Sequence, residues 1–249
     1  HKEKKKSKQM GSAGFRTDIQ ALRAIALLLV LAFHVWPARL PGGYVGVDVF
    51  FVISGYLITG HLLREVASTG SVHLPTFYAR RACRLLPAAS LTLVAVCAAA
   101  YLWTPASTWT STAADMAASS MYAQNWVLVR RSVDYLAQDE PPSPLQHFWS
   151  LAVEEQFYLG WPLVVGGVAA WWRRRRSGDG IPALPGLPPL PPPRRAYALP
   201  MGALCALSFG AALYYARVDP AAGYFMTHTR LYELGVGGLL GVWAAGRRG

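Results

Sequence analysis

The sequence has little charge for its length and few acidic residues. Charged residues make up 15% of the 249 positions, and only 13 residues are Asp or Glu, whereas soluble proteins are about 25% charged. Hydrophobic residues account for 53% of the chain. This combination argues against a soluble domain and favours a protein whose apolar side chains face lipid.

Cysteine is also scarce. Cys83, Cys97 and Cys205 lie in or beside apolar segments and show no paired spacing, so we expect neither a disulfide framework nor a metal site. The first apolar segment follows basic residues and has no convincing small-residue cleavage site. We therefore interpret it as a retained helix rather than a signal peptide, which keeps Arg23 and His34 in the mature protein.

Long apolar segments are abundant and predict an all-α fold, a polytopic transmembrane helix bundle. We expect about six spans, of which the last is short and rich in glycine. They cover Ile19–Trp36, Tyr44–Leu63, Leu85–Trp103, Phe148–Trp172, Tyr197–Ala216 and Leu231–Ala245.

The net charge of +11 does not indicate nucleic-acid binding, because the basic residues cluster at the ends of apolar spans as topology signals. If the Lys2–Lys8 run is cytoplasmic, alternate loops place Arg80 and Arg173–Arg176 on the same side. We therefore predict a multi-pass protein of the plasma membrane, with both ends of this chain cytoplasmic and the lipid bilayer as its partner.

The remaining segments suggest the domain organisation. Residues 1–13 form a basic cytoplasmic tail, residues 14–249 the transmembrane domain, and residues 177–195 a proline-rich cytoplasmic linker of polyproline character. Trp109–Val129 is expected to be an interfacial helix on the outer side. The absence of an initiating Met suggests a fragment.

Arg23 and His34 are eleven positions apart on one predicted helix. Eleven residues make nearly three turns, so both side chains project from one stripe, about 16 Å apart along the axis. An Arg that snorkels to headgroups and a His near a helix end would explain them structurally. Ionisable groups at depth usually line a functional interior, and we favour that interpretation.

Asp48 enters the second span shortly after the loop that follows His34. A short hairpin would bring the two to similar depth, where a carboxylate could fix the imidazole tautomer of a general base. A buried structural ion pair is equally compatible with the sequence. Ser54 and Tyr56 nearby could donate hydroxyl hydrogen bonds, whereas Gly55 between them suggests close helix packing.

Two adjacent acids interrupt the apolar segment HFWSLAVEEQFYLGWPL. His147 and Glu154 are seven positions apart and share a face, and Glu155 is displaced by roughly 80°. Since this span enters from outside, both acids are expected in the outer half of the membrane. A polar contact that holds helices together is the structural alternative.

Arg80, Arg81 and Arg84 lie on the predicted cytoplasmic side. Their guanidinium groups could bind phosphates. Charge runs beside a span are more often topology signals and headgroup contacts, and the residue pattern alone favours that interpretation.

Taken together, the motifs resemble acyltransferase family 3, a family of polytopic membrane proteins. The similarity extends in order from Phe15 to Gly241 and is specific in combination. The matching segments are FRTDIQALRAIALLLVLAFH, GGYVGVDVFFVISGYLIT, FYARRACRLLP, HFWSLAVEEQFYLGWP and TRLYELGVGGLLG.

The resemblance implies transfer of an acyl group, usually acetyl, from cytoplasmic acyl-CoA (acetyl-CoA) to a carbohydrate hydroxyl. Family acceptors include peptidoglycan, O-antigen, exopolysaccharide and, in another branch, macrolide antibiotics. The motifs are most similar to the branch that often carries an SGNH-type esterase domain, which this chain does not contain. The family's membrane module commonly has about ten helices, so we expect an incomplete module here.

The family pattern makes His34 the leading catalytic residue, with Arg23 supporting the donor site and Arg80, Arg81 and Arg84 near the phosphates of the coenzyme. We expect Asp48 or Glu154 to orient His34, with Glu155 as a further catalytic candidate. The sequence leaves direct transfer and a covalent acyl-enzyme relay both open. The candidates for substrate binding are Ser54, Tyr56, His147 and Arg230.

Three other functions fit parts of the sequence. A proton-coupled transporter also carries Arg, His and carboxylates within its spans, but it does not explain a basic cytoplasmic loop next to a membrane-embedded His. An inactive scaffold or sensor would keep the fold without turnover. The acceptor of an active enzyme could also be a small-molecule glycoside or a macrolide.

Overall fold

The computed structural model describes residues 16–133, 143–178 and 190–245. These residues form helices joined by turns, without a β-strand among them, so the expected all-α fold is confirmed. They belong to two compact units, the first up to Ile53 and the second from Ser54.

The first unit is a helical hairpin. Helix α2 (Thr17–Val35) is followed by turns, and α3 (Val45–Thr69) then begins. A Cβ atom at Gly43 would clash with the backbone of Leu29, and one at Gly46 would clash with the backbone of Ala26. Glycine therefore lets the returning chain lie directly on α2, and the two segments run antiparallel.

The second unit contains the rest of α3 and the helices that follow it. It includes α4 (Leu74–Trp103), the 3₁₀ turn η1 (Ala106–Thr108), α5 (Trp109–Ser120), α6 (Gln124–Val133), α7 (Phe148–Gly178), α8 (Arg194–Val218), α9 (Pro220–Phe225) and α10 (Thr227–Ala245).

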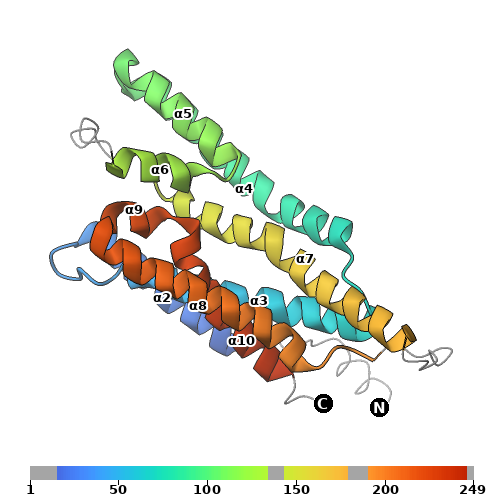
Figure 1. Cartoon of the computed structure of the whole chain (residues 1–249). Coiled ribbons are helices and arrows are strands. Elements are labelled where there is room, and N and C mark those ends of the chain that lie inside the picture. Colours follow the sequence, from blue (N-terminus) through green and yellow to red (C-terminus); the bar gives the residue numbers. More distant parts are fainter. Residues whose placement is uncertain (1–15, 134–142, 179–189, 246–249) are drawn as a thin grey trace, which may run out of the picture. The chain divides into compact units, whose positions relative to one another are not determined.

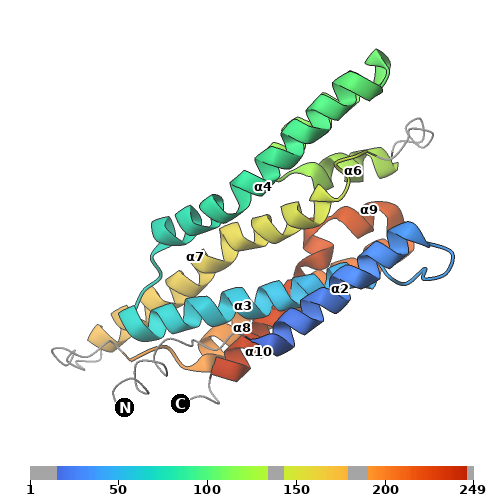
Figure 2. The ribbon, with the colours of Figure 1, turned by 180° about the vertical axis from the view of Figure 1, so that it is seen from behind.

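Helix α10 packs closely on α8 and α3. It runs beside α8 in both views (Figures 1 and 2). The side chains of Met201 and Cys205 of α8 lie directly against Gly235 and Gly238 of α10. A Cβ atom at Gly55 of α3 would clash with the backbone carbonyl of Leu234 in α10. Small residues at these contacts allow backbones to approach each other, as in membrane helix packing.

Four of the described helices, α2, α3, α4 and α8, are long and apolar enough to cross a membrane. The other two expected spans correspond to α7 and α10, which are less apolar. The helical bundle with membrane-spanning character is therefore confirmed, whereas the six-span topology stays a prediction.

Several element boundaries differ from the sequence-based expectation. Helix α4 begins eleven residues before the expected start of its span, because FYARRACRLL is itself helical and Pro87 is accommodated inside the helix. The expected helix 109–129 is split by a turn at Tyr122. The predicted linker 177–195 begins within the last residues of α7 and ends within the first residues of α8, and residues 179–189 and the tail 1–13 lie outside the described residues.

Candidate functional site

His34 lies in the last turn of α2 and is exposed. Its Nδ1 atom is 2.8 Å from the carbonyl oxygen of Val30. A carbonyl only accepts hydrogen bonds, so Nδ1 carries the proton, and a neutral imidazole then leaves Nε2 as an acceptor. The backbone of α2 therefore sets the tautomer that a general base requires.

The register of the hairpin does not match the expected placement of Asp48 beside His34. Gly46 lies level with the segment between Ala26 and Val30, so Asp48, two residues later, is about 12 Å from the level of His34 along the helix axis. It is closer to the level of Arg23. The expectation was wrong because the chain turns back along α2 before α3 begins, which moves α3 forward in register.

In the second unit, Glu154 accepts two hydrogen bonds from hydroxyl groups. Ser54 Oγ and the Tyr158 hydroxyl each donate to Glu154 Oε1 at 2.6 Å. Tyr158 is one turn further along α7, and Ser54 belongs to α3. These bonds fix the carboxylate from two sides and satisfy a group that would be costly to leave unpaired.

Glu155 pairs with Arg81 of α4. Arg81 Nη2 lies 2.6 Å from Glu155 Oε1, and the two side chains are 19% and 16% exposed. The guanidinium carbon of Arg81 also lies 3.6 Å from the centre of the Tyr158 ring, within cation–π range. Ser54, Arg81, Glu154, Glu155 and Tyr158 thus form one connected group, which we call the acid cluster.

Arg81 and Glu155 must lie at one depth because they are in contact. Glu155 is eighteen residues, about 27 Å, before Arg173 along α7. The expectation that Arg81 lies at the cytoplasmic surface and Glu155 in the outer half of the membrane is therefore wrong for this pair. The cause is that the N-terminal part of α4 runs antiparallel to α7, where the Tyr78 hydroxyl donates to the Leu159 carbonyl at 2.8 Å.

The other predicted residues of the second unit differ in burial and in their contacts. Arg80 and Arg84 are exposed on α4, and His147 is exposed just before α7. Tyr56 is half-buried on α3. Arg230 pairs with Glu233 at 2.7 Å within α10 and lies over the ring of Tyr224.

A second polar group was not predicted from the sequence. Gln156 donates to the Asn125 side chain at 3.0 Å, Asn125 donates to Thr227 Oγ1 at 2.9 Å, and Thr227 donates to Gln156 Oε1. We call these three residues the amide ring; they connect α7, α6 and α10. The only sequence signal was an uncharged amide directly after the two acids.

The amide ring also fixes the turn between α5 and α6. Gln156 Nε2 donates to the backbone carbonyl of Tyr122 at 2.9 Å. Tyr122 has a φ angle of 52°, the one positive value for a non-glycine residue in the described part of the chain. Such a conformation is costly for a tyrosine and persists only when surrounding contacts hold it.

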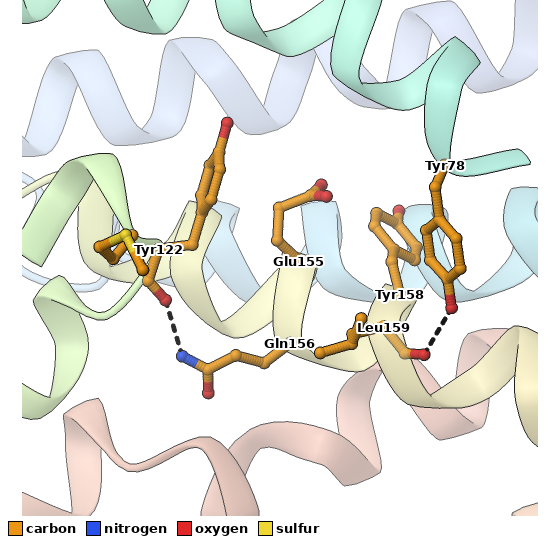
Figure 3. A pocket seen from close by; sticks show the side chains of 7 residues that line it. Tyr78, Tyr122, Glu155, Gln156, Tyr158 and Leu159 are labelled. Carbon is orange, nitrogen blue, oxygen red and sulfur yellow. Dashed lines mark hydrogen bonds between the residues drawn. The ribbon is translucent and has the colours of Figure 1, made fainter. Parts of the chain in front are cut away.

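A pocket of about 240 Å³ lies beside the acid cluster. Figure 3 shows the Tyr122 ring and the Glu155 carboxylate projecting to the same side of α7, whereas Gln156 points the other way. Burial and the neighbouring carboxylate of Glu155 raise the pKa of Tyr122, and Arg81 opposes this shift. The lining residues are Tyr78, Met121, Tyr122, Glu155, Gln156, Tyr158 and Leu159.

Metal-ligating side chains do not gather within the described ranges. No group of three or more His, Cys, Asp or Glu residues there is arranged to hold a metal ion.

Comparison with known proteins gives a consistent result. A family model described as an acyltransferase domain matches residues 16–248. The peptidoglycan O-acetyltransferase OatA of Listeria monocytogenes is 34% identical over 217 residues, which are 87% of this chain and 32% of the relative. A Bacillus subtilis protein named "Putative peptidoglycan O-acetyltransferase YrhL" is 35% identical over 228 residues, 90% of this chain and 33% of the relative.

The chain spans about a third of the length of these curated relatives. No solved structure matches it. The family model covers all of the described residues, and both relatives exceed 30% identity. The resemblance seen in the motifs is thereby confirmed, and the chain belongs to acyltransferase family 3, the family of this acyltransferase domain.

Proposed function

We propose that the chain is the membrane part of an O-acyltransferase that moves an acyl group, acetyl in the simplest case, from acyl-CoA to a hydroxyl of a cell-wall carbohydrate. The names of the two relatives support peptidoglycan as the acceptor. The observation that carries the proposal is His34, whose Nδ1 is engaged by Val30 and whose Nε2 can accept a proton.

In the direct route, the acceptor hydroxyl attacks the thioester carbonyl while Nε2 of His34 takes its proton. The tetrahedral intermediate then expels the coenzyme thiolate, which receives the proton back from the imidazolium. An ester and a free thiol result, and no oxidant or further reactant is required. In the relay route, Nε2 of His34 attacks the thioester carbonyl and expels the coenzyme thiolate; the acceptor hydroxyl then displaces the imidazole from the acyl group, and its proton goes to the thiolate.

We assign the phosphates of the donor to Arg80 and Arg84 rather than to Arg81. Arg80 and Arg84 are exposed, so their planar guanidinium groups can pair with phosphate oxygens. Arg81 is already paired with Glu155 and covered by Tyr158. Arg23 remains a proposed donor-site residue of the first unit, and a cytoplasmic location of both chain ends in the plasma membrane is part of the same proposal.

The acid cluster is proposed to serve the acceptor. Glu154 is fixed by Ser54 and Tyr158, which gives a carboxylate of defined direction for a sugar hydroxyl. That Glu154 and His34 act on one substrate stays a prediction, as do the substrate-binding roles of Tyr56, His147 and Arg230. Asp48 is retained as a proposed site residue near the level of Arg23 and not as the group that orients His34.

The decisive experiment replaces His34 in the full-length protein. We expect His34→Ala to abolish acetylation of cell-wall glycans, measured by mass spectrometry as one missing acetyl increment, while membrane insertion is unchanged. His73→Ala is a matched control, because His73 is exposed and has no assigned role. Full acetylation by the His34 variant would refute the proposal, and substrate flux without consumption of acyl-CoA would favour a transporter instead.

A further inference from the structure

The pocket beside the acid cluster presents three tyrosine rings and one carboxylate. Tyr78, Tyr122 and Tyr158 line it together with Glu155. A volume of about 240 Å³ is below the roughly 300–1,000 Å³ of sites for drug-sized ligands, so the pocket suits one ring-sized unit. Tyrosine offers a flat apolar face and a polar edge, and a sugar ring has C–H faces and hydroxyl edges that match them.

The three phenols are not equivalent. The Tyr78 hydroxyl donates to the Leu159 carbonyl and the Tyr158 hydroxyl donates to Glu154. The Tyr122 hydroxyl has no hydrogen-bond partner among the described residues that line the pocket. Tyr122 is therefore the phenol that can both stack on a ligand and bind one of its hydroxyl groups.

The conformation of Tyr122 indicates that its position matters. Its φ angle of 52° would be relieved by glycine or asparagine, which adopt left-handed conformations more readily. The chain instead keeps a bulky ring there and fixes its carbonyl through Gln156. Strained residues held by their surroundings are a feature of ligand sites.

The amide ring holds Tyr122 in this conformation, and every side-chain N–H group of Gln156 and Asn125 donates a hydrogen bond. Gln156 donates to the Tyr122 carbonyl and to Asn125, and Asn125 donates to the Phe225 carbonyl and to Thr227. Gln156 directly follows Glu155 on α7, so one helix positions both the carboxylate of the pocket and the backbone of Tyr122 beside it.

We propose that this pocket is the acceptor-sugar subsite, that Tyr122 is its specificity-determining residue, and that Gln156 is the positioning residue that holds Tyr122. The inference rests on the proposed function, because it assigns the carbohydrate acceptor of that reaction to one pocket. The ring-sized volume and the open phenol favour a sugar over a long acyl chain, which has no hydroxyl groups for Tyr122 to bind.

The test uses the full-length protein in lipid nanodiscs and a soluble N-acetylhexosamine tetrasaccharide as the probe. Tyr122→Gly keeps the left-handed backbone and removes the ring, so we expect probe affinity to fall at least about tenfold, the change that 1.4 kcal/mol produces. The thermal midpoint should stay equal or rise, because the strain is removed. Tyr122→Phe should lower the affinity for the probe about threefold. Tyr214→Phe changes an exposed tyrosine of α8 and should leave the affinity for the probe unchanged.

Gln156→Met tests the positioning role. It removes the donors to Tyr122 and Asn125 with little change in volume, so the apparent KM for the acceptor should rise several-fold while the KM for the acyl donor stays constant. A residue that only stabilises the fold would lower the amount of active protein and leave both KM values unchanged. That result would overturn the role of Gln156.

The outcomes separate this inference from the proposed function. Undiminished probe binding by Tyr122→Gly, or the absence of probe binding by the wild type, overturns the sugar subsite even if His34→Ala abolishes transfer. Lost binding by Tyr122→Gly together with full transfer by His34→Ala supports the subsite and refutes the catalytic assignment.

Discussion

Removing both partners of the Arg81–Glu155 pair should destabilise the protein by less than the sum of the two single removals. The pair is close, at 2.6 Å, and 16–19% exposed. Breaking a fully buried pair from one side costs about 3–5 kcal/mol because a charge is left without its partner. With partial exposure we expect about 2–3 kcal/mol for Arg81→Met or Glu155→Gln, which lowers the thermal midpoint by about 5–10 °C at the usual 2–4 °C per kcal/mol for a chain of this size.

A double-mutant cycle measures the interaction itself. Arg81→Met combined with Glu155→Gln leaves no unpaired charge, so the double variant should be about 2 kcal/mol more stable than the sum of the single losses predicts. The assay is thermal unfolding of the purified protein in detergent, followed by tryptophan fluorescence. Additivity within about 0.5 kcal/mol would refute the ion pair as an energetic unit.

Arg84→Met is the matched control, because Arg84 lies on the same helix and is exposed. It should leave the thermal midpoint nearly unchanged and raise the KM for acyl-CoA, since Arg84 is a proposed phosphate ligand. Arg81→Met should lower the thermal midpoint and leave the KM for acyl-CoA nearly unchanged. If Arg81→Met alone weakens donor binding, Arg81 contacts the donor and the division of roles among these arginines is wrong.

Two further predictions concern packing and pH. Gly55→Ala should cost about 1–3 kcal/mol by overpacking against the backbone of Leu234, whereas Gly202→Ala, which has open space around it, should stabilise α8 by about 0.5–1 kcal/mol; equal effects in thermal unfolding would contradict the close contact. Since burial and Glu155 raise the pKa of Tyr122, the folded state holds the phenolic proton more tightly, and this contribution to stability is present below about pH 10 and lost above it. Glu155→Gln should move the titration of Tyr122, followed by ultraviolet absorbance, to lower pH, and an unchanged titration would exclude that electrostatic coupling.

Local patterns in the sequence predicted the helices and the divergence of the two acids. Hydropathy located each long apolar helix, and the roughly 100° between the adjacent residues Glu154 and Glu155 on one helix gave them different neighbours, as the structure has it. Their partners could not be predicted, because Ser54 and Arg81 are 100 and 74 positions away and belong to other helices.

Depth and turns were less accessible to sequence reasoning. Asp48 was misplaced because the sequence of the hairpin loop does not reveal at which residues the two helices come level, and that level is set by the contacts of Gly43 and Gly46. Arg81 was misplaced because basic residues beside a span are usually topology signals, whereas Arg81 forms an ion pair with the carboxylate of Glu155. The left-handed conformation at Tyr122 could not be predicted, because the residue is neither glycine nor asparagine, the types that usually mark such a turn.

The glycine contacts of α10 have a consequence for motion. Helix α10 touches α3 backbone to backbone at Gly55, and side chains of α8 fill the space at Gly235 and Gly238, so α10 cannot rotate or slide by one residue without a clash with either neighbour. We therefore expect α8, α10 and the part of α3 from Ser54 to move as one rigid body. Helix α4 meets α7 through the side chains of Tyr78 and Arg81, so any widening of the pocket to admit a ligand should come from α4, which can swing outward by changing a few rotamers.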